Sequence, residues 1–146
     1  MDNLHSCFSL LRKMGSIFMD KHLNEYGLSY NYSTYLWHIC KTEGIRQDHL
    51  SDHLRVNRST TKRAIDHLES HGYVTKEVYE LDKRKYCLYP TQKAYDILDE
   101  IKHLKKEWDD IITEDLSEEE KEFAYKINEK MLKTSKLYVK ENLQNK

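Results

Sequence analysis

The stretch Arg55-Val56-Asn57-Arg58-Ser59-Thr60-Thr61-Lys62-Arg63 decides the fold of this chain. It holds four cations and no acid, although the chain of 146 residues has a formal net charge of −1. From this stretch onward, residues suited to a buried face recur at helical spacing, namely Thr61, Ala64, Ile65 and Leu68. The spacing predicts a helix with one buried face. The opposite face would then present Ser59, Thr60, Lys62, Arg63 and Asp66.

A helix whose outer face carries hydroxyls and cations can bind DNA base edges and phosphates. An ordinary solvent-facing helix is the competing interpretation of these residues alone. The preceding residues 47–54 form a short helical pattern, and 55–57 form a turn in which Asn57 is a suitable N-cap. The second helix is expected to run to about His71, because Gly72 suits the position just after a helix end. Two helices joined by a short turn predict a helix-turn-helix.

A hairpin is predicted directly after these two helices. Residues 74–79 and 86–89 are rich in β-branched and aromatic side chains, and the charged segment Glu80-Leu81-Asp82-Lys83-Arg84-Lys85 separates them. A hairpin in this position is a wing. The fold class is therefore expected to be mainly α with a small two-stranded β-hairpin wing.

Helices with apolar stripes flank this cassette on both sides. Residues 4–23 show helical spacing, a polar connection is expected over 29–33, and a shorter helix follows around 35–40. A heptad-like run extends through Ala94, Ile97, Ile101, Leu104, Trp108 and Ile111. Ser117 and Glu120 form a capping box that starts a last helix. These stripes exceed what the cassette can cover and predict a homodimer, with a monomeric helical bundle as the alternative.

Composition bounds the class of protein. Hydrophobic residues make up 38% and charged residues 34%, and only four Gly and one Pro are present, which favours helices over an all-β fold. No apolar run reaches the length of a membrane span, so we expect a cytoplasmic protein without a membrane partner. Three separated cysteines argue against a disulfide framework. Residues 45–93 hold ten Lys and Arg against seven Asp and Glu, which places the basic charge where the cassette lies.

Several segments, taken together, resemble the MarR family of winged-helix transcriptional regulators. They are Leu10-Leu11-Arg12, Val56-x-Arg58-Ser59-Thr60 with Arg63, Leu68-Glu69-x-x-Gly72, Asp82-x-Arg84, and Leu88-x-x-Thr91-x-Lys93. The resemblance implies a dimer that places two recognition helices in successive major grooves of a palindromic operator, with the wings in the flanking minor grooves. The DNA-binding residues it implies are Arg58, Ser59, Thr60, Lys62, Arg63, Asp82 and Arg84. Thr61 departs from the pattern, because the family usually has an apolar residue there.

The resemblance also divides the chain into parts. Residues 1–146 would form a single domain, in which 1–30 and 110–146 are dimerisation helices, 31–93 the winged helix-turn-helix lobe and 94–114 a long connecting helix. In this family aromatic effectors often bind between the dimer helices and the DNA lobe. Such a phenolic effector could be bound by Tyr30, Tyr32, Tyr35, Trp37 and His38, although core packing with hydrogen-bonded hydroxyls is the simpler explanation of these aromatic residues. The segment around Cys7 resembles a peroxide-sensing branch, so thiol oxidation is a second possible trigger, with a buried structural cysteine as its alternative.

Other chemistry finds little support in the sequence. His49 and His53, and likewise His67 and His71, have a spacing that can bind zinc, but no acid or cysteine completes either site, so no metal and no cofactor are expected. Phosphate-binding loops and nucleophile elbows are missing, so we do not expect an enzyme. The function predicted is a homodimeric, sequence-specific DNA-binding regulator, a repressor released by an effector or by oxidation. A winged-helix protein-interaction module is the alternative.

Overall fold

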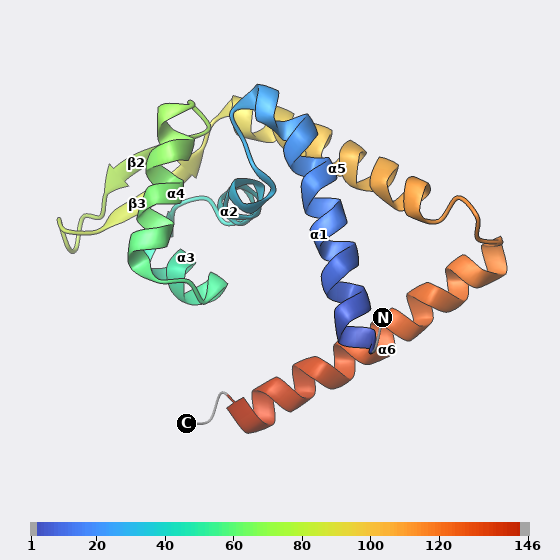
Figure 1. Cartoon of the computed structure of the whole chain (residues 1–146). Coiled ribbons are helices and arrows are strands. Elements are labelled where there is room, and N and C mark those ends of the chain that lie inside the picture. Colours follow the sequence, from blue (N-terminus) through green and yellow to red (C-terminus); the bar gives the residue numbers. More distant parts are fainter. Residues whose placement is uncertain (1–2, 144–146) are drawn as a thin grey trace. The chain divides into compact units, whose positions relative to one another are not determined.

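The computed structural model describes residues 3–143 (Figure 1). The chain divides into two compact units, Met1–Trp108 and Asp109–Lys146. The first unit contains α1 (Leu4–Leu23), a short 3-10 helix (Asn24–Tyr26), α2 (Tyr30–Lys41), β1 (Ile45–Arg46), α3 (Gln47–Leu54), α4 (Arg58–Ser70), β2 (Val74–Val78), β3 (Tyr86–Pro90) and most of α5 (Gln92–Ile112). The second contains the end of α5 and all of α6 (Glu118–Leu143).

The two helices at the start of the chain begin with side-chain caps. Asn3 caps α1 by accepting a hydrogen bond from the backbone N–H of Ser6 at 2.9 Å. Ser29 caps α2 in the same way through the N–H of Tyr32. The carboxylate of Asp20 also accepts from the N–H of Tyr30 at 2.7 Å. Residues 30–33 are therefore helical, and the polar connection predicted over 29–33 is wrong, because these two acceptors satisfy the first free N–H groups of α2.

The helix-turn-helix is built as its sequence predicts. Between α3 and α4 the turn includes Arg55 in a left-handed conformation, with φ of 54°. Asn57 caps α4, and its side-chain oxygen accepts from the N–H of Thr60 at 2.8 Å. Helix α4 ends at Ser70, and Gly72 follows with φ of 76°. Local signals thus place both helices correctly, because caps and left-handed terminators act within one turn of the chain.

The sheet has three strands in the order β1-β3-β2, all antiparallel. The hairpin of β2 and β3 confirms the predicted wing (Figure 1). Strand β1 is an addition that the sequence does not predict; it pairs Ile45 with Leu88 and Arg46 with Cys87 and so becomes a third strand beside the hairpin. Sequence reading misses β1 because a strand of two residues shows no alternation, and only its partner makes it a strand.

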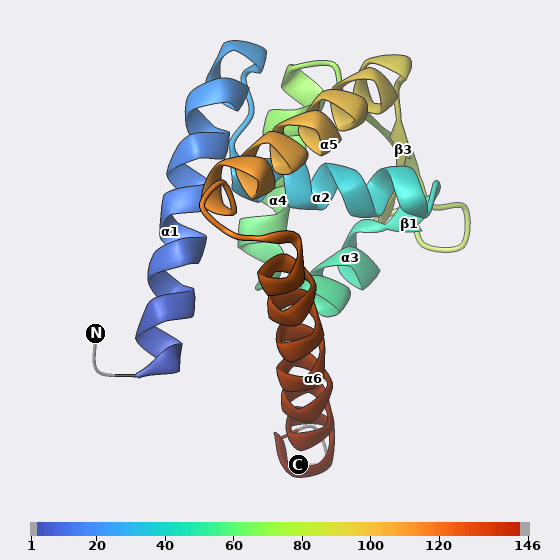
Figure 2. The same ribbon diagram turned by 90° about the vertical axis from the view of Figure 1, so that its right-hand side faces the viewer.

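The core of the first unit lies where α4 meets the other helices and the sheet. The predicted inner face of α4 is confirmed, because Thr61, Ala64, Ile65 and Leu68 are all buried. Buried side chains from α2, α3, β3 and α5 join the same cluster, among them Leu36, Ile39, Leu50, Leu88 and Ile97. In Figure 2, α2, α3 and α4 lie beside one another, with β1 and β3 at one end of α2. This packing holds the outer face of α4 toward solvent.

Helix α6 starts with the predicted capping box. The backbone N–H of Ser117 donates to Glu120 Oε2 at 2.8 Å, and the N–H of Glu120 donates to Ser117 Oγ at 3.3 Å. None of the described residues of α6 is buried. Within residues 3–143, no helix is long and apolar enough to cross a membrane.

Candidate nucleic-acid interface

The first two turns of α4 present the polar side chains that the sequence singles out. Arg58, Ser59, Lys62 and Arg63 are exposed, and Thr60 is half-buried. The hydroxyl of Ser59 donates to Asn57 Oδ1 at 2.7 Å, so the cap also orients this side chain. The N-terminus of a helix carries free N–H groups and a positive dipole end, which favour an approaching phosphate.

A charge network ties the base of the wing to α4. Lys76 of β2 donates to Asp66 Oδ1 at 2.9 Å and contacts Glu69 Oε2 at 2.6 Å, and both acids lie on α4. Lys62 also donates to the carboxylate of Asp66, at 2.5 Å. The hydrogen bond from Lys62, followed by that from Lys76, lowers the pKa of Asp66. The recognition helix and strand β2 are therefore held together by ion pairs on the solvent side of the core.

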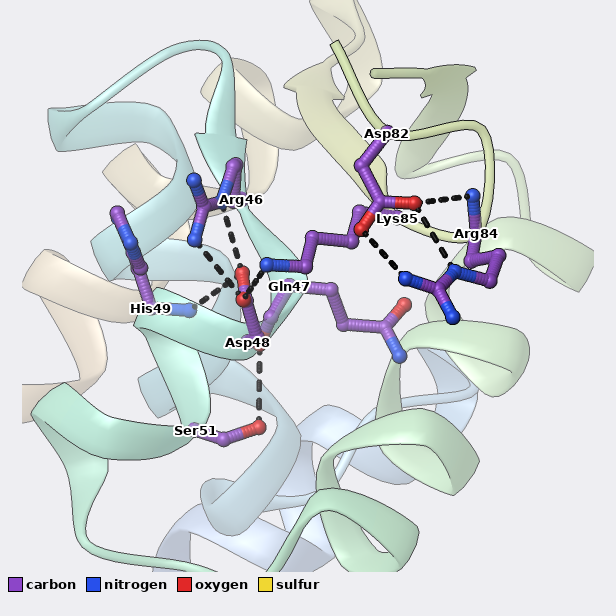
Figure 3. Close-up of polar contacts among 8 residues, drawn as sticks. All are labelled: Arg46, Gln47, Asp48, His49, Ser51, Asp82, Arg84 and Lys85. Atoms are coloured by element: carbon purple, nitrogen blue, oxygen red, sulfur yellow. Dashed lines mark hydrogen bonds and ion pairs between the residues drawn. The ribbon is translucent and has the colours of Figure 1, made fainter.

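The tip of the wing is a hydrogen-bonded turn that displays Arg84. The N–H of Tyr79 donates to the carbonyl of Lys85, and the N–H of Lys85 donates to the carbonyl of Asp82, each at 2.9 Å. Asp82 Oδ1 accepts from the backbone N–H of Arg84 at 3.1 Å and from its Nε at 3.2 Å (Figure 3). The Arg84 side chain is nevertheless 91% exposed. Its direction is thus set by Asp82 while its outer edge stays available to a ligand.

Asp48 on the first turn of α3 is the centre of a second cluster (Figure 3). Its carboxylate accepts from Arg46 Nε and Nη2, both at 2.9 Å, and forms an ion pair with Lys85 Nζ at 3.2 Å. The side chain of Asp48 is only 14% exposed. The hydrogen bonds from Arg46 hold the pKa of this carboxyl far below its ordinary value, and Lys85 adds to the effect. Asp48 is therefore ionised in the folded lobe at neutral pH.

Between these clusters lies a cleft of about 430 Å³. Its walls come from α3, the start of α4 and the wing, and its lining residues are Gln47, Asp48, Ser51, Arg58, Asp82, Arg84, Lys85 and Tyr86. The cleft brings Arg58 of the recognition helix and Arg84 of the wing to one surface. Two DNA-binding residues predicted from separate motifs are thus placed together, and they give that surface a cationic rim.

A second groove, of about 710 Å³, runs along α2 and the turn before α4. It is lined mainly by apolar and hydroxyl-bearing groups: Ser29, Asn31, Tyr32, Thr34, Tyr35, Leu54, Val56, Thr60, Arg63 and Ala64. Of the five aromatic residues named for an effector pocket, Tyr32 and Tyr35 line this groove. The other three lie elsewhere on α2. Tyr30 packs against the core, Trp37 is 42% exposed beneath the ammonium of Lys41, and His38 faces the ring of His53.

The remaining candidate groups are dispersed. Cys7 is half-buried on α1, and all three cysteines are free. Within residues 3–143, no group of three or more His, Cys, Asp or Glu side chains is placed to hold a metal ion. His67 and His71 stack with their ring centres 4.1 Å apart, and His67 Nε2 donates to the carbonyl of Gly27 at 2.6 Å. These two imidazoles thus connect the recognition helix to the turn after α1.

Sequence reading missed Arg46, Asp48, Lys76 and Lys85 as parts of this interface. Each lies among ordinary charged residues, and its partner is distant in the sequence or on another element. The one signal in the sequence was an acid, Asp48, in the first turn of the helix that follows Arg46, because an acidic residue there suits the positive end of the helix dipole.

The geometry by itself defines a class of protein. A recognition helix with an exposed cationic face, a supporting helix and an adjacent wing with an exposed arginine make up a winged helix-turn-helix DNA-binding protein. The sequence profile of the MarR family matches residues 26–85. The chain belongs to the MarR family of transcriptional regulators, which are DNA-binding proteins and not enzymes.

Relatives of known name and structure support this assignment. The chain is 30% identical over 110 residues to the HTH-type transcriptional regulator BilQ of Clostridioides difficile. The aligned residues make up 75% of this chain and 74% of that protein. A MarR protein structure from Peptoclostridium difficile is 34% identical, with a TM-score of 0.73 over 92% of this chain and 89% of that one. A crystal structure of MarR has a TM-score of 0.84 at 23% identity, covering 90% of this chain and 96% of that one, and it supports the fold.

Proposed function

We propose that this protein is a homodimeric repressor that binds a palindromic operator and leaves it when an aromatic effector binds. The proposal that the protein binds an operator rests on one observation, the surface that the start of α4 and the wing form together. Arg58, Lys62 and Arg63 face solvent on the helix, and the Arg84 guanidinium extends from the wing. A helix of this kind fits a major groove, and an exposed arginine fits the narrow, electronegative minor groove beside it.

Each predicted residue then has a defined role. Ser59 and Thr60 lie on the first turn of α4, where recognition helices meet base edges, so they would set sequence preference. Arg58, Lys62 and Arg63 would neutralise phosphates or bind guanine edges. Asp82 would hold Arg84 in the minor groove by the hydrogen bonds it already makes.

The dimer is supported by apolar side chains left at the surface of both units. Helix α1 exposes Leu4, Phe8, Leu10, Leu11, Met14 and Ile17. Helix α6 exposes Phe123, Tyr125, Ile127, Leu132, Leu137, Tyr138 and Leu143. Exposed apolar side chains in such number on two helices are uncommon on soluble monomers and mark association surfaces. A second copy would cover the same side chains by two-fold symmetry, which also matches a palindromic operator.

Release is supported by the groove beside α2. An aromatic ligand between Tyr32 and Tyr35 would also contact Thr60 and Arg63, and both of these residues are proposed to touch DNA. Ligand and DNA would then compete for the same side chains, which is the differential contact that a ligand needs to shift a binding equilibrium. Oxidation of Cys7 is the second trigger, and its place on the exposed stripe of α1 would let it disturb the dimer.

The test is binding to genomic fragments selected by the protein itself. Fluorescence anisotropy with the selected palindromic duplex should show affinity well above that for a random duplex and a steep fall with salt. Arg84→Ala should weaken binding about tenfold or more, because each dimer would lose two minor-groove contacts. Equal affinity for both duplexes would exclude specific recognition, and sedimentation as a monomer at micromolar concentration would exclude the dimer.

The two triggers need separate tests. Thr34→Trp places a large side chain in the groove from an exposed position on α2, so DNA binding should persist while release by phenolic ligands is lost. To test the thiol, organic hydroperoxide is added to the protein–DNA complex. It should release the wild-type protein from DNA and leave Cys7→Ser bound. Equal release of both proteins would remove Cys7 from the mechanism.

A further inference from the structure

The Arg46–Asp48 pair holds both ends of the wing turn. On the far side of the turn, Lys85 Nζ is 3.2 Å from Asp48 Oδ2. On the near side, the Arg46 guanidinium lies 5.2 Å from the centre of the Tyr79 ring, a cation–π distance. Asp48 fixes the direction of Arg46 by accepting two parallel hydrogen bonds from it. One carboxylate on α3 therefore reaches, directly or through Arg46, the residues where the wing turn begins and ends.

Those two wing residues also close the turn that carries Arg84. The backbone N–H of Tyr79 donates to the carbonyl of Lys85, and that of Lys85 donates to the carbonyl of Asp82. Arg84 in turn is oriented by the side chain of Asp82. A displacement of Lys85 would therefore also displace Arg84, because the two residues are neighbours in the chain and belong to the same hydrogen-bonded turn. Figure 3 shows Asp48, Lys85, Asp82 and Arg84 following one another across the cleft.

The base of the wing is held independently. Lys76 on β2 contacts Asp66 and Glu69 of α4, and pairing with β3 secures the strand. These contacts fix where the hairpin starts, but the tip extends beyond them. A two-stranded ribbon twists readily, so its tip needs a separate contact with the body of the lobe to keep one direction. The Asp48 cluster supplies that contact.

From this arrangement we infer that Asp48 is a positioning residue for DNA binding, which acts by holding the wing tip so that Arg84 meets the minor groove at a set distance from the recognition helix. This inference rests on the proposed role of Arg84. We assign Asp48 no contact with DNA, because Arg46 and Lys85 pair with its carboxylate and leave only 14% of its side chain exposed. Its effect on binding would come from less motion of the wing before binding, which lowers the entropy lost on forming the complex.

The experiment is a double-mutant cycle of Asp48→Asn and Arg84→Ala, measured by anisotropy on the selected operator. If Asp48 acts through Arg84, Asp48→Asn should weaken binding about threefold to tenfold in the wild-type background and have almost no effect when Arg84 is already Ala. Hydroxyl-radical footprints should lose protection at the flanking minor grooves, while methylation protection of major-groove guanines stays. Additive effects in the cycle, or unchanged binding by Asp48→Asn, would overturn the inference.

Matched variants separate the alternatives. Asp99→Asn removes the same charge from an exposed pair with Lys102 and should leave binding unchanged, which controls for a general gain in positive charge. Lys85→Gln breaks the tip contact alone, and it provides the same cycle if Asp48→Asn does not fold. Arg84→Ala alone separates a failure of the proposed function from a failure of the role assigned to Asp48. Wild-type binding by Arg84→Ala contradicts the proposed function, whereas weakened binding with additive cycles contradicts only the role of Asp48.

Discussion

Thr61 offers a direct test of how the recognition helix is held in the lobe. Its side chain is fully buried on the inner face of α4, together with Ala64, Ile65 and Leu68. Among residues 3–143, its Oγ1 is the buried side-chain polar atom without a hydrogen-bond partner. A buried hydroxyl without a partner lowers stability, because it loses its hydrogen bonds to water on folding. Replacing Thr61 with Val removes the hydroxyl and keeps the shape and the β-branching.

The size of the effect follows from the burial. Protein mutational data place the cost of burying an unpaired hydroxyl at about 1–3 kcal/mol. The added methyl group has nearly the shape of the lost hydroxyl, so an apolar group replaces the unpaired polar one without a cavity. Thr61→Val should therefore raise the free energy of unfolding by about 1–2 kcal/mol, which corresponds to about 3–6 °C in Tm for a protein of this size.

The assay is urea unfolding followed by circular dichroism at one fixed protein concentration, because a dimer's stability depends on concentration. Thr61→Ser is the matched control, since it keeps the hydroxyl and deletes only the methyl group. It should lower stability by about 1 kcal/mol. DNA affinity should be unchanged in both variants, because the side chain points into the core.

A specific result would refute this reasoning. If Thr61→Val were less stable than the wild type by about 1 kcal/mol, the hydroxyl would have to form a hydrogen bond in the folded protein. The face of α4 would then need a polar residue at this position. A change in operator preference would likewise show that the buried face influences recognition.

Other contacts support three further predictions. Gly27→Ala should destabilise the lobe by at least about 2 kcal/mol in urea unfolding, since Gly27 has φ of 69° and an added Cβ would overlap the imidazole ring of His71. The hydrogen bonds from Arg46 lower the pKa of Asp48, so its contribution to the free energy of unfolding should be complete above its ordinary pKa of 3.8 and be lost as the pH falls below that value. In urea unfolding at a series of pH values, Asp48→Asn should therefore lose less stability than the wild type on acidification. Burial, with a smaller contribution from Glu43, raises the pKa of Cys40 to about 11, so its alkylation by iodoacetamide should be slow at pH 8 and rise steeply toward that value.

The sequence by itself determined the recognition cassette. The spacing of Thr61, Ala64 and Leu68 defines a buried helix face, and Asn57 and Gly72 mark where that helix begins and ends. These signals are local, because a helix brings together residues three or four apart and its caps act within one turn. The exposed residues of α4 and the arginine of the wing therefore follow from the order of residues alone.

Only the tertiary structure decided how these parts are joined. Strand β1 exists because Ile45 meets Leu88, and the cleft exists because Asp48 meets Lys85 across it. The groove beside α2 likewise combines residues from α2, α3 and α4, and it includes only two of the aromatic residues expected there. Each of these features depends on which distant segments come into contact, and that depends on the packing of the whole core. Local spacing identified the groups that we propose to face DNA, whereas long-range packing determined what holds them in place.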